Sequence, residues 1–524
     1  MKTLPVIDYL IIFVSLLASV AVGVFFARKG QKSTKKYFAA EGKLPAWAIG
    51  MSIMATLISS ITFLAYPGEG FSTNWIRLVQ GIMVPVVLIF LIWVIVPLYR
   101  KVIGISAYEY FERRFGYFAR LYSSLGFVMA HFSKMGTVFY LLSLAISAMT
   151  GIDTLTVLWA MGVIVILVTL LGGIEAVIWL DTIQGFLLIA GGIVSLLIIL
   201  FSVEGGAVEV WNIAKENGRI GFGPFNWDFV NLTFWVMAIN GIFYAIQKYG
   251  TDQTIVQRYL TARSDRDAIK SSLMGVLLSV PVWALFMFIG TALFSYYQSG
   301  ADVLPANLKA EEVFPYFIMT KMPVGITGLV ISALIAAAIS SLDSDLNCLS
   351  AVGVEDFYAK LKPNATDKMK LRMGKITVII AGIAALLVGS LYTILEGEGV
   401  LGIVFTLYAI FSGGIAGIFL AGLFIKRIGR KSLYVGIGAC VMFTAYAVLT
   451  STKIGTGAEA GLILDLGKWN YSHHPYMLGV YSHLVLMAVA YVASFFTRED
   501  AGDETLTIYP WLRNLKSRNW LKNK

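Results

Sequence analysis

The chain has few charged residues, few cysteines and few histidines, and each shortage excludes a class of protein. Charged residues fill only 14% of its 524 positions, whereas hydrophobic residues fill 58%. An ordinary soluble domain has about 25% charged residues. So little charge excludes a soluble globular protein and indicates a protein that lies in a membrane.

The two cysteines, Cys348 and Cys440, both fall inside apolar segments. They predict neither a disulfide framework nor a cysteine metal site. The four histidines show no His-Glu-x-x-His spacing and no Ser/His/Asp order; they are His131, His473, His474 and His483. The sequence therefore predicts a protein that is not an enzyme.

Long apolar runs take up most of the chain. A helix needs about 20 mainly apolar residues to cross a bilayer, because its backbone must satisfy its own hydrogen bonds in lipid. We count about thirteen such segments: 6–27, 45–67, 75–99, 118–148, 153–172, 176–202, 231–249, 271–295, 324–353, 375–394, 398–425, 432–450 and 476–497. We therefore predict an all-α integral membrane protein with no soluble domain between the helices.

Lysine and arginine are distributed unequally over the two sides that this helix count defines. With the N-terminus outside, 31 of the 41 basic residues fall on one side and eight on the other. Basic loops face the cytoplasm. We therefore expect a multi-pass protein of the cell inner (plasma) membrane, with an outside N-terminus and a cytoplasmic C-terminus. The basic, tryptophan-bearing tail at 498–524 is expected to lie along the inner membrane surface.

Polar residues at membrane depth mark ion or substrate pathways, because they are costly there. The stretch AAAISSLDSDLNCLS at 336–350 holds four serines, two aspartates and an asparagine. On a helix, Ser340, Ser344 and Asn347 share one face, and Ser341 lies beside it. Hydroxyl and carboxylate oxygens suit hard cations. The alternative is close helix packing through small residues, with Asp345 near the cytoplasmic water.

Asp181, in the block GGIEAVIWLDTIQG, is a second carboxylate inside a predicted span. A buried carboxylate needs a cation or a proton. Sodium is a natural partner if helix oxygens converge there, and a structural aspartate that carries a proton or pairs with a lysine is the alternative.

Two segments have the composition of broken helices, which bind ions or solutes where unwound backbone lines a cavity. The first, 51–71, is rich in hydroxyl residues and ends with Pro and Gly; the second, 240–253, lies five helices later. Their spacing predicts two five-helix repeats, 45–202 and 231–425, each starting with an irregular helix. Lys134, near the middle of its span, either binds an anion in a wet cavity or pairs with a protein carboxylate.

Four stretches together resemble the sodium:solute symporter family, which includes sodium/glucose cotransporters and bacterial sialic acid transporters. They are YFAAEGKLPAWAIGMSIMATLISS, GGIEAVIWLDTIQG, TDQTIVQRYLTARS and AAAISSLDS. The resemblance spans about residues 8 to 450. It implies the five-plus-five inverted-repeat fold of the bacterial leucine transporter, with one extra N-terminal helix (1–30), two C-terminal helices (432–497) and a cytoplasmic tail (498–524).

The resemblance also implies sodium as the transported co-ion, one ion or two. The first site would use the carbonyls of Ala55, Ile58 and Ala337 with the hydroxyls of Ser340 and Ser341. A second site, present in some members, would use Asp181, Ser341, Asp343 and Ser344. Asp343 departs from the usual Ser or Thr of the family, which places two carboxylates near one cation.

The substrate region resembles the sialic acid transporters more than the hexose transporters. The expected substrate-binding residues are Ser59, Ser60, Thr62, Gln80 and Lys134. Hexose-transporting members carry a Gln at the position of Thr62 and a Glu at that of Gly81, and neither is present. Lys134 stands where the sialic acid transporters have an arginine for the carboxylate, and it lacks the bidentate fork.

We therefore expect Na⁺-coupled import of a carboxylated sugar such as sialic acid, or of another organic anion, by alternating access. A neutral sugar or inositol is the alternative substrate, and a sodium channel is a remote alternative, because a channel needs a ring of ligands and this chain is asymmetric. Expected partners are the small-molecule substrate and the lipid bilayer, with no nucleic acid and no obligatory protein partner.

Overall fold

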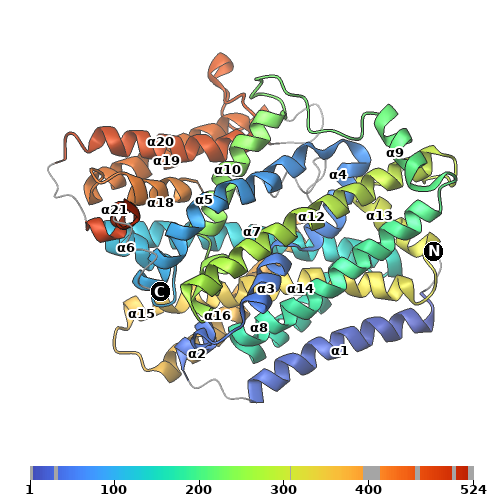
Figure 1. The fold of residues 1–524 in the computed structure, drawn as a ribbon, viewed down its shortest axis with the longest axis horizontal. Coiled ribbons are helices and arrows are strands. Elements are labelled where there is room, and N and C mark those ends of the chain that lie inside the picture. The colour runs from blue at the N-terminus through green and yellow to red at the C-terminus, as the bar shows by residue number, and fades with distance from the viewer. Residues whose placement is uncertain are drawn as a thin grey trace.

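The computed structural model describes residues 4–28, 33–306, 308–393, 413–454, 461–497 and 503–516. The chain is almost wholly helical over these ranges (Figure 1). The first half contains α1 (Val6–Arg28), α2 (Thr34–Ala39), α3 (Ala46–Leu57), α4 (Tyr66–Ser72), α5 (Leu78–Val102), α6 (Glu109–Phe115), α7 (Tyr117–Thr150), α8 (Thr154–Phe201) and α9 (Gly206–Glu216).

The second half continues with helices of the same kind and one small sheet. The helices are α10 (Phe234–Gly250), α11 (Gln253–Thr261), α12 (Asp265–Gln298), α13 (Ala310–Lys321), α14 (Ile326–Val352), α15 (Ala359–Leu361), α16 (Asp367–Tyr392), α18 (Ile415–Phe424), α19 (Arg430–Ser451), α20 (Pro475–Ala493) and α21 (Tyr509–Lys516). The antiparallel strands β1 (Lys453–Ile454) and β2 (Gly461–Leu462) form a short two-stranded sheet.

Nine of the described helices are long and apolar enough to span a membrane, and the bent pair α3 and α4 makes a tenth. The predicted segments 153–172 and 176–202 form one element, α8, in which Gly173 has a φ of 63°. That left-handed conformation suits glycine and divides the helix into two arms. The segment 231–249 is α10, and part of 398–425 lies outside the described residues. An all-α membrane protein is confirmed, while the repeat boundaries 45–202 and 231–425 stay predictions.

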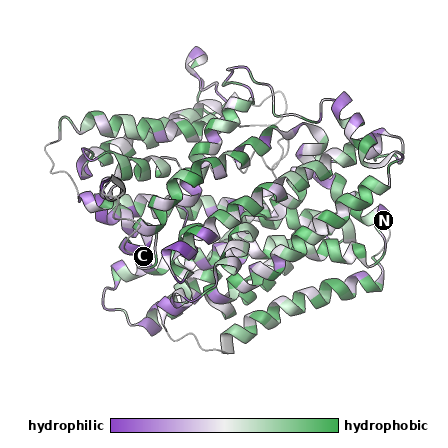
Figure 2. Ribbon diagram, viewed as in Figure 1, coloured by the Kyte–Doolittle hydropathy of each residue, from purple (hydrophilic) through white to green (hydrophobic). Residues whose placement is uncertain are grey.

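Hydrophobic residues make up most of each long helix, and hydrophilic residues gather toward the helix ends and loops (Figure 2). Large side chains such as Phe90 and Phe186 are more than half exposed on the outer surface. In water this exposure would be costly, but in a bilayer these side chains contact lipid.

The N-terminal helix α1 runs along one edge of the molecule, and α19 and α20 lie together at the opposite edge (Figure 1). Asp8 on α1 accepts hydrogen bonds from the backbone N–H groups of Gly325 and Gly328, at 2.8 and 2.7 Å. These donors belong to the first turn of α14, where a carboxylate is favourable. Gly328 is needed here, because a Cβ would lie 2.7 Å from Cα of Asp8.

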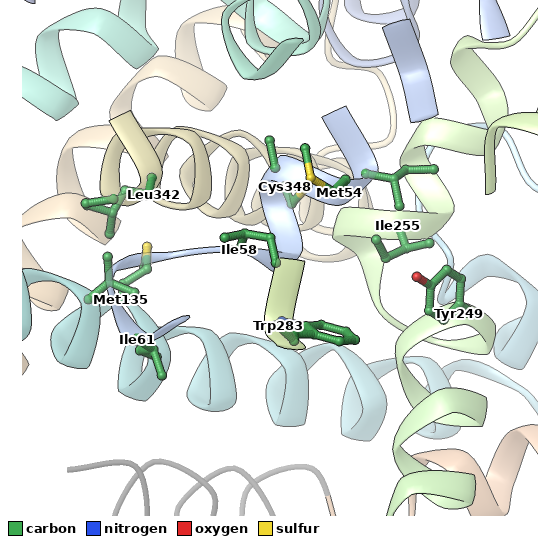
Figure 3. Packing of buried hydrophobic residues seen from close by; sticks show 14 of the residues in the cluster. Met54, Ile58, Ile61, Met135, Tyr249, Ile255, Trp283, Leu342 and Cys348 are labelled. Atoms are coloured by element: carbon green, nitrogen blue, oxygen red, sulfur yellow. The ribbon is translucent and has the colours of Figure 1, made fainter. Parts of the chain in front are cut away.

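The core is centred on the broken helix α3–α4, which packs against α12, with α3 also against α8. Figure 3 shows buried side chains at this centre, including Met54, Ile58 and Trp283, which come from α3, the break after it and α12. A close-packed centre of this kind fixes the polar segments of α3 and α14 relative to each other.

Candidate functional site

The first broken helix forms as the hydroxyl-rich segment 51–71 predicts. Helix α3 ends at Leu57, Ile58 takes an extended conformation (φ −100°, ψ 116°), and a π-helical turn covers Ile61–Ala65. The two helical parts are bent by 60°. The break lies well before Pro67, which sits in the first turn of α4. It leaves backbone carbonyls of the last turn of α3 without partners inside that helix.

These carbonyls face the serines of α14. Ser340 Oγ lies 3.2 Å from the carbonyl oxygens of both Ala55 and Ala337. Ser341 Oγ lies 3.3 Å from the carbonyl oxygen of Ile58. The structure thus places the expected carbonyls against the two expected hydroxyls in two groups, one at Ser340 and one at Ser341, and all five residues are buried. Carbonyl and hydroxyl oxygens without a fixed charge fit a monovalent hard cation.

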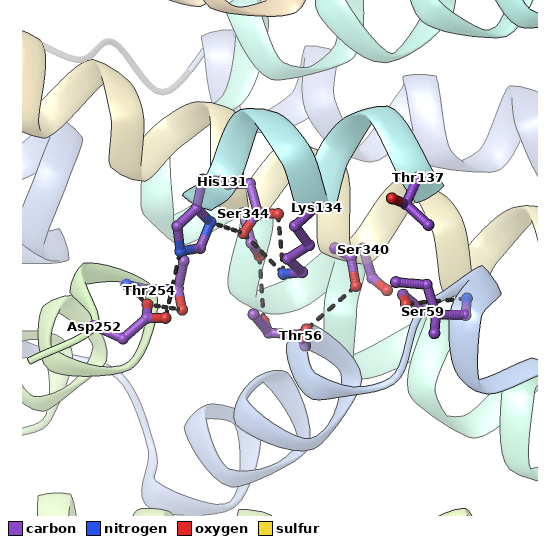
Figure 4. Close-up of polar contacts among 12 residues, drawn as sticks. Thr56, Ser59, His131, Lys134, Thr137, Asp252, Thr254, Ser340 and Ser344 are labelled. Carbon is purple, nitrogen blue, oxygen red and sulfur yellow. Dashed lines mark hydrogen bonds and ion pairs between the residues drawn. The ribbon is translucent and has the colours of Figure 1, made fainter. Parts of the chain in front are cut away.

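Asp181 lies on the second arm of α8 and is fully buried. Its Oδ2 accepts hydrogen bonds from Ser52 at 2.5 Å and from Ser344 at 3.4 Å. The structure thus brings Asp181 and Ser344 together, as expected for the second sodium site. Thr56 joins them, since its hydroxyl lies 3.3 Å from that of Ser344 (Figure 4).

Arg258 occupies the middle of this polar group, which the sequence did not lead us to expect. Its Nη2 lies 2.8 Å from Asp181 Oδ2 and 2.8 Å from Ser344 Oγ, and its Nε donates to Ser52 at 2.8 Å. Both partners of the ion pair have fully buried side chains. Asp181 is therefore paired with a basic residue of the protein, but the partner is Arg258 and not the lysine that we considered.

Asp343 lies beside this pair, also with no exposed surface. Within the described part of the chain, neither of its carboxylate oxygens has a hydrogen-bond partner, nor has Oδ1 of Asp181. The two carboxylates are close enough for their charges to interact. Three buried oxygens without donors are a cost that a bound cation or a proton removes.

A partly open pocket lies beside the break in the first helix. Four of the five predicted substrate residues line it: Ser59, Thr62, Gln80 and Lys134. Ser60 does not line it, because it is fully buried and its hydroxyl donates to the carbonyl of Val138 at 3.0 Å. Further lining residues that we did not predict include Tyr66, Tyr244, Lys248 and Trp283.

Lys134 both lines the cavity and pairs with a protein carboxylate, so its two predicted roles are not exclusive. Its Nζ lies 2.9 Å from Asp345 Oδ2, and its side chain keeps 18% exposure. The expectation that Asp345 lies near cytoplasmic water is wrong, because its side chain has 0% exposure. Inside the protein, the carboxylate of Asp345 on α14 contacts the basic groups of Lys134 and His131, which both belong to α7.

The predicted second broken segment, 240–253, is continuous helix α10 up to Gly250, and the chain breaks only at its end, before α11. The chain leaves the helical path at Thr251 and Asp252, and Asp252 caps α11 by accepting from the N–H of Thr254 at 2.8 Å. Lys248 at the end of α10 pairs with Asp252 at 2.6 Å. Figure 4 shows His131 of α7 facing Asp252, and its Nε2 lies 3.3 Å from Oδ2 of Asp252.

With this geometry described, comparison with known proteins is informative. The model of the sodium:solute symporter family matches residues 37–437. The chain belongs to this family. The sodium/sialic acid symporter NanT of Aliivibrio fischeri is 35% identical over 439 residues, which cover 83% of this chain and 86% of that protein. The sodium/sialic acid symporter SiaT of Proteus mirabilis is 34% identical over 436 residues, covering 82% and 87%.

Solved structures agree with this membership. A Na⁺-coupled sialic acid symporter, in a substrate-bound outward-open state with a novel Na⁺ site, has a TM-score of 0.84 at 31% identity and covers 94% of this chain and 98% of its own. Mhp1, a nucleobase-cation-symport-1 transporter in a closed conformation, has a TM-score of 0.59 at 14% identity, over 91% of this chain and 98% of its own, and supports the fold alone.

Membership in the sodium:solute symporter family makes this chain a secondary transporter rather than an enzyme. Sodium is its coupling ion, and a small molecule is its cargo. The chain is a multi-pass membrane protein.

Proposed function

We propose that this chain imports a carboxylated sugar of the sialic acid type together with sodium. The support is the pocket beside the broken helix, which is lined by Ser59, Thr62, Gln80 and the cation Lys134. Lys134 is the single observation that carries the acidic part of the proposal, because an ammonium group at membrane depth binds a carboxylate. The sialic acid symporters NanT and SiaT are the relatives that agree.

The packing beside Gly81 adds an argument against a hexose. Members that transport hexoses carry a glutamate at this position. In this chain a Cβ on Gly81 would lie 2.6 Å from the ring of Trp283, so the ring fills the space that a longer side chain needs. At this position a hexose would therefore meet the apolar ring of Trp283 and not the carboxylate of a glutamate.

The first sodium ion, in this proposal, binds the carbonyls of Ala55, Ile58 and Ala337 with the hydroxyls of Ser340 and Ser341. Support comes from the contacts between these carbonyls and hydroxyls at the end of α3. Binding there joins α3 to α14 and fixes the break, and the residues after the break, Ser59 and Thr62, line the cavity. Sodium binding thus prepares the substrate site.

A second sodium ion would bind at Asp181, Ser341, Asp343 and Ser344. Arg258 already neutralises one carboxylate there, so the unpartnered oxygens of Asp343 and Oδ1 of Asp181 are the atoms that call for another cation. One charge moving inward across 100 mV releases about 2.3 kcal/mol, and two ions about double that.

A neutral sugar or inositol is a second candidate substrate, and one contact favours it. Lys134 is already paired with Asp345 at 2.9 Å, which reduces the need for an acidic ligand. A neutral polyol could use the hydroxyls and amides of the cavity without disturbing this pair.

The orientation of the chain is part of the proposal. We infer an outside N-terminus, a cytoplasmic C-terminus and a place in the inner (plasma) membrane, because the basic residues are concentrated on one side. This orientation puts α9 and α13 outside and α2, α6 and α11 toward the cytoplasm.

The experiment that tests the substrate is thermal unfolding of the purified protein with a panel of solutes. A ligand that binds the folded state raises its unfolding temperature. We expect sialic acid to stabilise the protein in Na⁺ and not in choline, and hexoses and inositol to have no effect. Stabilisation by the neutral solutes with none by sialic acid would replace the first candidate with the second.

A further inference from the structure

Five ionisable side chains form one buried cluster beside the substrate cavity, where three helices and the break between α10 and α11 meet. Their exposed fractions run from 0 to 18%. They are His131 and Lys134 of α7, Lys248 of α10, Asp252 before α11 and Asp345 of α14. Charges at this depth persist only when they are paired.

The five groups follow one another with acids and bases alternating. Lys134 Nζ lies 2.9 Å from Asp345, and Asp345 lies 3.1 Å from Nδ1 of His131. Nε2 of His131 lies 3.3 Å from Asp252, and Asp252 lies 2.6 Å from Lys248. His131 is therefore the central member, with one carboxylate at each ring nitrogen (Figure 4).

This placement indicates which charge His131 carries. A neutral imidazole has one N–H donor, and its other nitrogen presents a lone pair. With a carboxylate oxygen within 3.3 Å of both nitrogens, a neutral ring would set a lone pair against a negative charge. The Nδ1 contact is out of line for a hydrogen bond, so it is an electrostatic contact, which the charged ring makes favourable.

The contact between His131 and Phe127 is also favourable for a positively charged imidazole. The ring of Phe127 lies with its centroid 4.0 Å from that of His131. An aromatic ring attracts a positive charge held close to it. His131 itself is 2% exposed, so water contributes little to its solvation.

The charge count of the cluster then depends on this one residue. Lys134, Lys248 and a protonated His131 give three positive charges, and Asp252 and Asp345 give two negative charges. The sum is 3 − 2 = +1, whereas a neutral His131 makes it 2 − 2 = 0. Both lysines line the cavity, so the extra positive charge acts on whatever binds there.

We propose that His131 sets the charge of the substrate pocket: as an imidazolium shared between Asp345 and Asp252, it leaves the cluster one positive charge that the carboxylate of the cargo neutralises. His131 does not line the cavity and acts as a positioning residue. With a neutral residue in its place, Asp345 and Asp252 would bind only the two lysines and make them less available to an anion. This inference rests on the proposed acidic substrate.

The test compares two variants of the purified full-length protein, His131→Gln, which is neutral, and His131→Lys, which keeps a positive charge. The probes are sialic acid and its methyl ester, which differ by the negative charge and one methyl group, and their Kd values are measured by calorimetry in saturating Na⁺. We expect His131→Gln to weaken binding of the acid about tenfold, which corresponds to about 1.4 kcal/mol, and to leave binding of the ester unchanged. His131→Lys should restore the preference for the acid.

His483→Gln is the matched control, because His483 is a buried histidine of α20 that does not line the cavity. It should keep the preference of the wild type. Equal weakening of acid and ester in His131→Gln would show that His131 is merely structural and would overturn this inference. If the wild type binds the acid more tightly than the ester and His131→Gln keeps the same preference, this inference alone is overturned. A wild type with no preference would overturn the proposed acidic substrate as well.

Discussion

Arg258 and Asp181 form an ion pair of 2.8 Å in which neither side chain has any exposed surface. The pair joins α11, the helix after the second break, to the second arm of α8. Three hydroxyl groups complete it: those of Ser52, Thr56 and Ser344. Since this pair is neutral, the charge that stays uncompensated in this region is that of Asp343.

Replacing Asp343 with Asn therefore tests the second sodium site. The variant removes the negative charge and keeps the size of the side chain. We expect the sodium dependence of uptake to change from a Hill coefficient of about 2 to about 1, because the coefficient is limited by the number of sites. Initial uptake rates measured over a sodium series give this value, and an unchanged coefficient would remove Asp343 from the ligand set.

The first sodium site is tested with Ser340→Ala and Ser341→Ala. Each variant removes one hydroxyl ligand, and a hydrogen-bond-sized contact to a charged group is worth about 1.5–3 kcal/mol. We expect the sodium concentration for half-maximal uptake to rise at least about tenfold.

Ser332→Ala is the control for these variants, because Ser332 is a buried serine of the same helix whose hydroxyl bonds back to Gly328. It should keep the sodium affinity of the wild type. If all three alanine variants behave alike, the effect belongs to helix packing and not to ion ligation.

Lys134→Ala tests the anchor of the cargo. We expect uptake of sialic acid to be lost and binding of its methyl ester to be weakened only slightly, because the ester cannot use the ammonium charge. Lys134→Arg should retain uptake of the acid, since a guanidinium also pairs with a carboxylate. Equal loss of acid and ester in Lys134→Ala would count against the anchor role.

His474, before the first turn of α20, gives a prediction about pH. Burial, with Arg77 nearby, lowers its pKa to about 4, and its unprotonated Nδ1 accepts from the N–H of Tyr476 at 3.3 Å. The unfolded value is about 6.5, so the unfolded chain binds more protons between these values. The lowered pKa of His474 therefore reduces the free energy of unfolding as the pH falls from 6.5 toward 4, and it has no such effect above pH 6.5.

Unfolding temperatures measured between pH 7 and 4 should show this loss in the wild type. His474→Asn keeps a side chain that caps a helix but removes the proton, so its pH dependence should be weaker. His473→Asn, at an exposed neighbour, should follow the wild type. Parallel curves for all three proteins would mean that His474 does not titrate as inferred.

The sequence was sufficient for the features that depend on local composition. The hydroxyl-rich segment 51–71 breaks as its composition predicts, whereas the segment 240–253 stays helical up to Gly250, and the serines of α14 face the first break. The positions of these serines could be predicted because helix periodicity places Ser340 and Ser341 on neighbouring faces without knowledge of the tertiary structure.

Arg258 shows what the sequence could not supply. A basic residue that follows an apolar segment is expected to face the cytoplasm, yet Arg258 is fully buried. Its position depends on the direction that α11 takes after the break at Asp252, and that direction is decided by packing against α14 and α3. The pairing of Asp345 with Lys134 has the same origin, since it depends on how α7 and α14 pack.

The central claim is that sodium bound between α3 and α14 drives accumulation of the cargo. The most direct measurement is uptake of sialic acid into proteoliposomes that contain the wild-type protein, with an inward gradient of Na⁺ or of choline at several proton gradients. We predict accumulation above the external concentration in Na⁺ and none in choline at any proton gradient. Equal accumulation in choline would contradict the account.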